Sequence, residues 1–126
     1  MIKIIYILFA IGLLMTVASA NNSFILTSLK DAEFLSESTG KPILLIFGTK
    51  SCKFCTELKS DLFSEPLKSA TDKYIICYLD LDENQELKDK YNIGLIPDSM
   101  VIKNGKEISR LKGYTSKNYE RWIKNL

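Results

Sequence analysis

Apolar residues along this chain fall into runs and alternations that predict four β-strands. The clearest is the continuous apolar run 43–47 (Ile-Leu-Leu-Ile-Phe), which is typical of a strand buried on both faces of a sheet. Further strands are expected at 74–81, 98–103 and 107–111. Asn104 and Gly105 are a strong signal for a two-residue hairpin, so the last two strands are predicted to be antiparallel.

Helical spacing and capping signals predict four helices. They are expected, in chain order, over 28–38, over 52–63, over 83–91, and from Thr115 or Ser116 to Leu126. The segment Ser64–Pro66 is expected to break or restart the second of these helices. The spacing assigns these large side chains to the core: Phe34, Phe47, Phe63, Tyr119, Trp122, Ile123 and Leu126.

The predicted order of elements is α-β-α-β-α-β-β-α. This order favours an α/β fold in which a four-stranded mixed sheet is flanked by helices. A chain of 126 residues suits one domain, and we expect that domain to span residues 21–126.

The first 20 residues have the layout of a secretory signal peptide. Lys3 gives a positive start, an apolar run follows from Ile4 to Met15, and Ala18-Ser19-Ala20 is a small-residue cleavage pattern. The alternative is an uncleaved membrane anchor, for which the apolar stretch is at the short end. We expect cleavage and export to the periplasm, a compartment in which disulfides persist.

Composition and charge exclude several function classes. The 17 basic and 15 acidic residues give a net charge of only +2 without a basic cluster, so a nucleic-acid-binding module is not expected. The sequence contains no histidine. That absence excludes Ser-His-Asp and Cys-His catalysis, histidine-ligated zinc, and haem with a proximal histidine.

One motif carries chemistry, the pair Cys52 and Cys55 at the junction of a buried strand and a helix. Cysteines three residues apart on a helix face the same side and can form a disulfide with little distortion. Cys52 at the helix start is next to unpaired backbone N–H groups, and Lys50 and Lys53 add positive charge. We therefore expect a lowered pKa for Cys52, which would make it the nucleophile, and a resolving role for the more shielded Cys55.

Two interpretations of this motif without redox chemistry are a structural disulfide and half of a zinc site. A bridge that closes so short a loop constrains the unfolded chain very little. Zinc needs about four ligands, and only Cys77 remains to help. We expect Cys77, in the middle of a strand, to be a buried and inert thiol. No metal and no bound cofactor are expected.

The order of several motifs resembles that of thioredoxin-fold proteins over about residues 28–126. Cys52-Lys53-Phe54-Cys55 follows the apolar strand, Ile96-Pro97 comes about forty residues later, and Lys103-Asn104-Gly105 and Gly113 complete the pattern. The resemblance implies a cis bond before Pro97, with that proline packed on the disulfide, and substrate pairing through the backbone of Ile96. Phe54 is expected to be partly exposed and to offer substrates an apolar contact.

The motif Cys-x-Phe-Cys and the segment Phe63–Pro66 resemble the exported SoxW-like and DsbD C-terminal thioredoxin-like domains. Cytoplasmic thioredoxins bury an acid and a lysine on the two core strands, but this chain has Ile46 and Tyr78 there. The usual proton acceptor for Cys55 is therefore missing from its expected place. Asp98 and Glu57 are candidate substitutes, although each has the character of a solvated surface acid.

These observations predict an exported, monomeric thiol–disulfide oxidoreductase, with a lean towards reductase. Its substrates would be thiols or disulfides of other proteins, and a redox partner such as a membrane reductase would reset it. The alternative is a thioredoxin-fold module that binds an extended peptide beside Ile96 and Pro97 with an inert disulfide.

Overall fold

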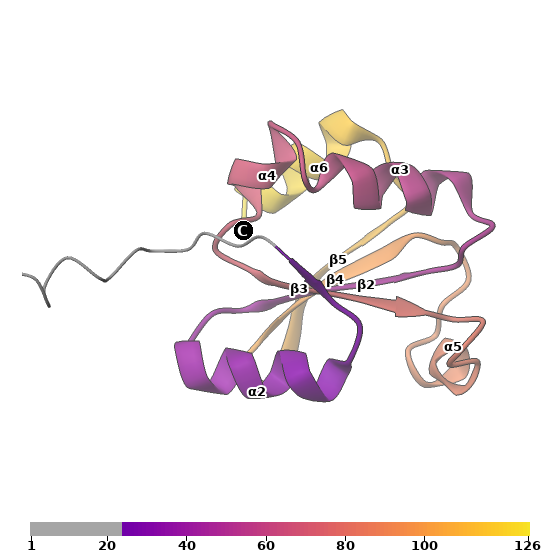
Figure 1. Ribbon diagram of the computed structural model, residues 1–126, viewed down its shortest axis with the longest axis horizontal. Coiled ribbons are helices and arrows are strands. Elements are labelled where there is room, and N and C mark those ends of the chain that lie inside the picture. Colours follow the sequence, from indigo (N-terminus) through magenta and orange to yellow (C-terminus); the bar gives the residue numbers. More distant parts are fainter. Residues whose placement is uncertain (1–23) are drawn as a thin grey trace, which may run out of the picture.

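The computed structural model describes residues 24–126, which form a mixed β-sheet with helices on both faces (Figure 1). The predicted signal peptide of residues 1–20 and its cleavage site lie outside the described residues. Within residues 24–126, no helix is long and apolar enough to cross a membrane.

The sheet has five strands in the spatial order β1-β3-β2-β4-β5. Their bounds are β1 Ile25–Leu26, β2 Ile43–Gly48, β3 Ile75–Asp80, β4 Asp98–Lys103 and β5 Lys106–Lys112. Strands β1, β2 and β3 are parallel, whereas β4 is antiparallel to β2 and to β5. The prediction of four strands was therefore one strand short. The additional strand, β1, has only two residues, too few to show an alternating pattern.

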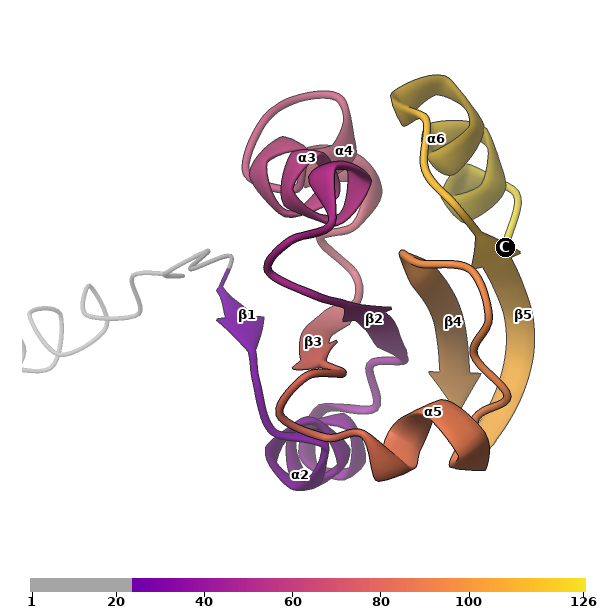
Figure 2. The same ribbon diagram turned by 90° about the vertical axis from the view of Figure 1, so that its right-hand side faces the viewer.

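The helices are α2 Leu29–Thr39, α3 Lys53–Asp61, α4 Leu67–Ala70, α5 Glu86–Lys90 and α6 Ser116–Lys124. Hydroxyl side chains cap two of them: Ser28 accepts from the Asp31 N–H and Thr115 from the Asn118 N–H, each at 3.3 Å. The chain does restart a short helix after Pro66, and the predicted helix at 83–91 is reduced to one turn, α5. Helices α3, α4 and α6 cover one face of the sheet, and α2 and α5 lie on the other (Figure 2).

Each face of the sheet has its own apolar core. The face under α3 and α6 buries Leu44, Ile46, Cys55, Leu58, Tyr78, Val101, Tyr119 and Ile123. The face over α2 buries Ala32, Leu45, Phe47, Cys77, Leu79 and Met100. Strand β2 contributes to both cores, as its continuous apolar run predicts.

Three aromatic or aliphatic side chains assigned to the core are in fact on the surface. Phe34 is 68% exposed, and Phe63 and Leu126 are exposed as well. Helix α2 buries the stripe around Ala32, and Phe34 lies two residues further on, which is more than half a turn away from that stripe. Phe63 and Leu126 follow the last residues of α3 and α6, so helical spacing no longer directs them inward.

Candidate active site

Cys52 and Cys55 lie where β2 passes into α3 and are joined by a disulfide with a Cα–Cα distance of 5.2 Å. Cys52 is the N-cap of α3, and its sulfur accepts a hydrogen bond from the Cys55 N–H at 3.2 Å. Cys52 is half-buried, whereas Cys55 is completely buried in the core beneath α3. Only the first sulfur of the pair is therefore within reach of another protein.

The sheet register brings the loop before β4 to the same place. Because β4 is antiparallel to β2, Asp98 at the start of β4 pairs with Phe47 near the end of β2. Pro97 and Ile96 therefore lie beside the cysteines, and the carbonyl oxygen of Ile96 is 3.9 Å from the Cys52 sulfur. The Ile96–Pro97 peptide bond is cis, and Pro97 is buried.

Exposed apolar side chains flank this pair of segments. Phe54, between the two cysteines, is 54% exposed, and Leu95, just before Ile96, is 57% exposed. The sequence did not lead us to predict Leu95 as a site residue. Its position in the apolar loop before Pro97 could have indicated it. An exposed apolar rim of this kind is suited to contact with a protein partner.

Tyr78 reaches the buried sulfur from the neighbouring strand. It pairs with Ile46 in the register of β2 and β3, and it is almost fully buried. A Cβ atom at Gly48 would meet the Cys55 sulfur at 2.8 Å and ring carbon Cζ of Tyr78 at 2.9 Å. The sulfur and the phenol are therefore neighbours across Gly48.

Asp98, one of the two candidate proton acceptors, is not a solvated surface acid. It is fully buried, and the Arg110 guanidinium donates to both its carboxylate oxygens, from Nε at 2.8 Å and from Nη2 at 2.7 Å. This pair lies with Phe47 and Met100 on the sheet face opposite Cys55. The other candidate, Glu57, is exposed on α3 as expected.

Comparison with known proteins decides the family. A thioredoxin-like domain family matches residues 29–126. The chain is 31% identical to a thioredoxin of Alicyclobacillus acidocaldarius over 91 residues, which is 71% of this chain and 86% of that protein. It is 33% identical to a thioredoxin of Rickettsia bellii over 85 residues, 67% of this chain and 80% of that protein.

The fold agrees. The structure of Fasciola hepatica thioredoxin superposes with a TM-score of 0.65 and 26% identity, and the match covers 82% of this chain and 98% of that one. This chain belongs to the thioredoxin-like family. With its Cys52-x-x-Cys55 pair in a thioredoxin fold, it is a protein-disulfide oxidoreductase.

The charges expected to tune the thiolate of this thioredoxin-like domain are at its surface. The Lys50 ammonium lies 3.5 Å from a carboxylate oxygen of Glu83, and both side chains are exposed. Lys53 is exposed in the first turn of α3. Exposed ion pairs are screened by water and salt, whereas the positive end of α3 gives Cys52, its N-cap, a fixed positive potential.

Cys77 of the thioredoxin-like domain is buried on the face over α2, away from the disulfide. Burial, assisted by Asp31 and Glu33, raises the pKa of its thiol to about 12. The thiol is therefore protonated and inert at neutral pH. Among residues 24–126, no group of three or more cysteine, aspartate and glutamate side chains is placed to hold a metal ion.

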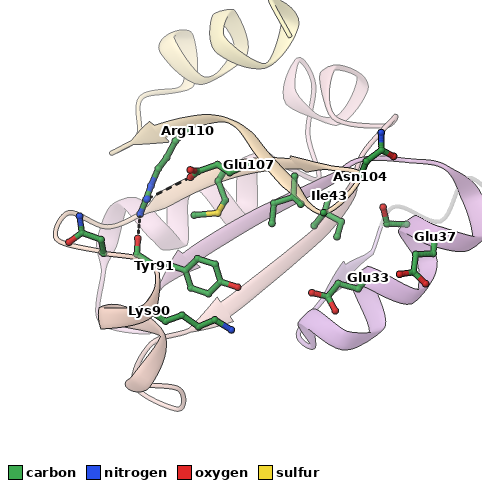
Figure 3. Close-up of a pocket in the computed structure, with 13 residues that line it drawn as sticks. Glu33, Glu37, Ile43, Lys90, Tyr91, Asn104, Glu107 and Arg110 are labelled. Atoms are coloured by element: carbon green, nitrogen blue, oxygen red, sulfur yellow. Dashed lines mark hydrogen bonds and ion pairs between the residues drawn. The ribbon is translucent and has the colours of Figure 1, made fainter.

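A cavity of about 750 Å³ opens on the same face, between α2 and the β4–β5 hairpin (Figure 3). Glu33 and Glu37 of α2 lie on one side, and Lys90, Tyr91 and Arg110 on the other. No cysteine lines this cavity. The redox chemistry of the thioredoxin-like domain is therefore placed at the end of β2, outside the cavity.

Proposed function

We propose that this protein reduces disulfides of other proteins outside the cytoplasm, with Cys52 as the attacking thiol and Cys55 as the resolving thiol. The observation that carries this assignment is the unequal burial of the pair: Cys52 is half-buried at a helix N-terminus and Cys55 is fully buried. Unpaired N–H groups at the start of α3 favour the thiolate form of Cys52.

The exchange has two steps. The Cys52 thiolate attacks one sulfur of a substrate disulfide, the substrate S–S bond breaks, and the other substrate sulfur leaves as a thiolate. The Cys55 thiolate then attacks the Cys52 sulfur of the mixed disulfide, closes the Cys52–Cys55 bond and releases the second substrate thiolate. Two electrons pass from the cysteine pair to the substrate, whose two thiolates take up protons.

An extended substrate segment is proposed to lie along Ile96, whose backbone adjoins the Cys52 sulfur. Phe54 and Leu95 offer it exposed apolar contacts. Because each turnover leaves the pair oxidised, a second redox partner must return two electrons. We assign that role to a membrane reductase and expect the protein to act as a monomer.

The proposed compartment is the periplasm. Its support is the signal-peptide pattern of residues 1–20, which ends in Ala18-Ser19-Ala20. The motif Cys-x-Phe-Cys, which resembles exported members of the family, points the same way. N-terminal sequencing of the protein recovered from periplasmic and membrane fractions tests this part: a periplasmic chain that begins at Asn21 supports it, and a membrane-bound chain that retains Met1 supports the membrane anchor.

Trapping tests the assignment of roles. With Cys55→Ser, Cys52 can form a mixed disulfide with a substrate protein but cannot be released, so covalent complexes are expected on a non-reducing gel. With Cys52→Ser, the buried Cys55 should trap none. The absence of complexes with both variants would favour the peptide-binding module with an inert disulfide.

The reduction potential of the Cys52–Cys55 pair tests the direction of electron transfer. It is measured by equilibration with glutathione or dithiothreitol. A value near that of thioredoxin, about −270 mV, supports a reductase. A value of about −120 to −180 mV would make the protein an oxidant or isomerase.

A further inference from the structure

The phenol of Tyr78, on strand β3, is a polar group beside the buried sulfur of Cys55. Both groups adjoin the space above Gly48, where they lie 2.8 Å (Cys55 Sγ) and 2.9 Å (Tyr78 Cζ) from the position of a Cβ atom. Ile46, the strand partner of Tyr78, is apolar and fully buried. An acid that could take the Cys55 proton is therefore absent from these two strand positions.

The Tyr78 hydroxyl is held loosely while the disulfide is closed. It donates to the backbone carbonyl of Thr49 at 3.5 Å, which is long for a hydrogen bond from a hydroxyl. Burial, assisted by Asp80, raises the pKa of Tyr78 to about 12. The phenol is therefore a hydrogen-bond donor at neutral pH and cannot serve as a base.

Tyr78 also contacts a surface groove and a charged side chain. It lines a groove of about 520 Å³ together with Thr49, Thr56, Lys59 and Asp80, among others. The Lys59 ammonium of α3 lies 4.5 Å from the centre of the Tyr78 ring. The phenol thus has its hydroxyl near the sulfur and its ring beside the Lys59 ammonium.

We propose that, when the disulfide opens, the Tyr78 hydroxyl turns from the Thr49 carbonyl and donates a hydrogen bond to the Cys55 thiolate. In this role Tyr78 is a positioning residue for the resolving step. The Cys55 thiol gives its proton to solvent once the disulfide is open, and the phenol keeps its own proton while it stabilises the resulting thiolate. The inference rests on the proposed role of Cys55 as the resolving thiol.

Charged groups around the phenol act in opposite directions. Lys59 above the ring favours a negative charge on the sulfur, and Asp80 on β3 opposes it. Lys50 and Glu83, which also line the groove, form an exposed pair and largely cancel each other. The hydroxyl of Tyr78 is a neutral donor beside the sulfur, and its removal leaves these charges unchanged.

The test uses the reduced full-length protein and Ellman's reagent, whose attack by Cys52 and later displacement by Cys55 each release one coloured thiolate. Tyr78→Phe removes only the hydroxyl. Tyr74→Phe, at a second buried tyrosine of the same core just before the start of β3, is the matched control. Circular dichroism and thermal unfolding check that both variants are folded.

For Tyr78→Phe we expect an unchanged first phase and a second phase whose pH midpoint rises by about one pH unit. Because a thiolate of higher pKa is scarcer but more nucleophilic, the second phase should be about threefold slower at pH 7 and about threefold faster on its alkaline plateau. The pH profiles of the variant and the unmodified protein should therefore cross. A general loss of order in the site would not make them cross.

Each failure has its own signature. A second phase with the same pH profile in Tyr78→Phe and in the unmodified protein would overturn the role of Tyr78 and leave the roles of the cysteines intact. Equal changes in Tyr74→Phe would also overturn it. A single phase in every protein, with no intramolecular release, would show that Cys55 does not resolve and that the proposed function itself is wrong.

Discussion

At the scale of single residues, the site depends on a position without a side chain. Gly48 ends β2 and is buried between the Cys55 sulfur and the Tyr78 ring. Contacts of 2.8 Å and 2.9 Å to a Cβ atom are shorter than packed side chains allow, so any larger residue must push one of these groups away.

Gly48→Ala is therefore expected to lower the free energy of unfolding by about 1–3 kcal/mol through overpacking. Urea unfolding of the oxidised protein measures this change. Gly94→Ala is the matched control, because a Cβ atom there has no neighbour within 4 Å. Equal stability of the two variants would contradict the packing argument.

At the scale of elements, a buried ion pair ties the start of β4 to β5. Arg110 of β5 holds the Asp98 carboxylate with two hydrogen bonds. It donates a third, at 2.8 Å, to the carbonyl of Tyr91, and Figure 3 shows this bond. The side chain of Arg110 thereby links the segment after α5 to the strand that begins directly after Pro97. We interpret this link as what fixes the loop beside Cys52.

Arg110→Met should lower the free energy of unfolding by about 3 kcal/mol, because it leaves the buried charge of Asp98 unpaired. Chemical denaturation checks the value, with the exposed Arg121→Met as control. The double variant Arg110→Met with Asp98→Leu should recover part of the loss. A single variant as stable as its control would show that the pair does not anchor the strand.

The elements that could be predicted from sequence are those marked by a regular pattern of apolar residues or by a short turn motif. The runs that form β2, β3 and β4 and the Asn104-Gly105 turn were predicted within about one residue. Strand β1 was missed because its pairing with β3 depends on a partner about fifty residues away. The burial of Asp98 was also missed, since an acid indicates a surface position until its partner, Arg110, is known.

Some residues of the site could also be predicted from sequence and others could not. The cysteine pair and the proline segment could be recognised because they are local motifs. The contact between Tyr78 and Cys55 depends on the register of β2 against β3 and on the lack of a side chain at Gly48. Spacing along the chain carries neither fact, so Tyr78 could be noticed only as a departure from the family pattern.

At the scale of the whole molecule, buried thiol and phenol groups govern the response to alkali. Burial raises the pKa of Cys77 and of Tyr78 to about 12, and it raises the pKa of Tyr114 and Tyr119 as well. In the unfolded chain these groups lose their protons at lower pH. The folded state therefore binds more protons than the unfolded state at alkaline pH, and stability falls as pH rises.

We expect the free energy of unfolding of the oxidised protein to stay level up to about pH 8 and to decline between about pH 9 and pH 12. Urea unfolding at a series of pH values measures this profile. Cys77→Ala should flatten its first part, because the thiol of the unfolded chain titrates before the phenols. A profile that is flat or rises through this range would contradict the prediction.

The groove beside Tyr78 has a consequence for the range of substrates. Its lining does not include Cys52, Phe54, Ile96 or Pro97, the residues over which a substrate protein would dock. The docking residues and the proposed partner of the Cys55 thiolate are therefore different side chains. Substrates that differ in the segment they lay on Phe54 and Ile96 meet the same resolving chemistry, so one second step serves many proteins.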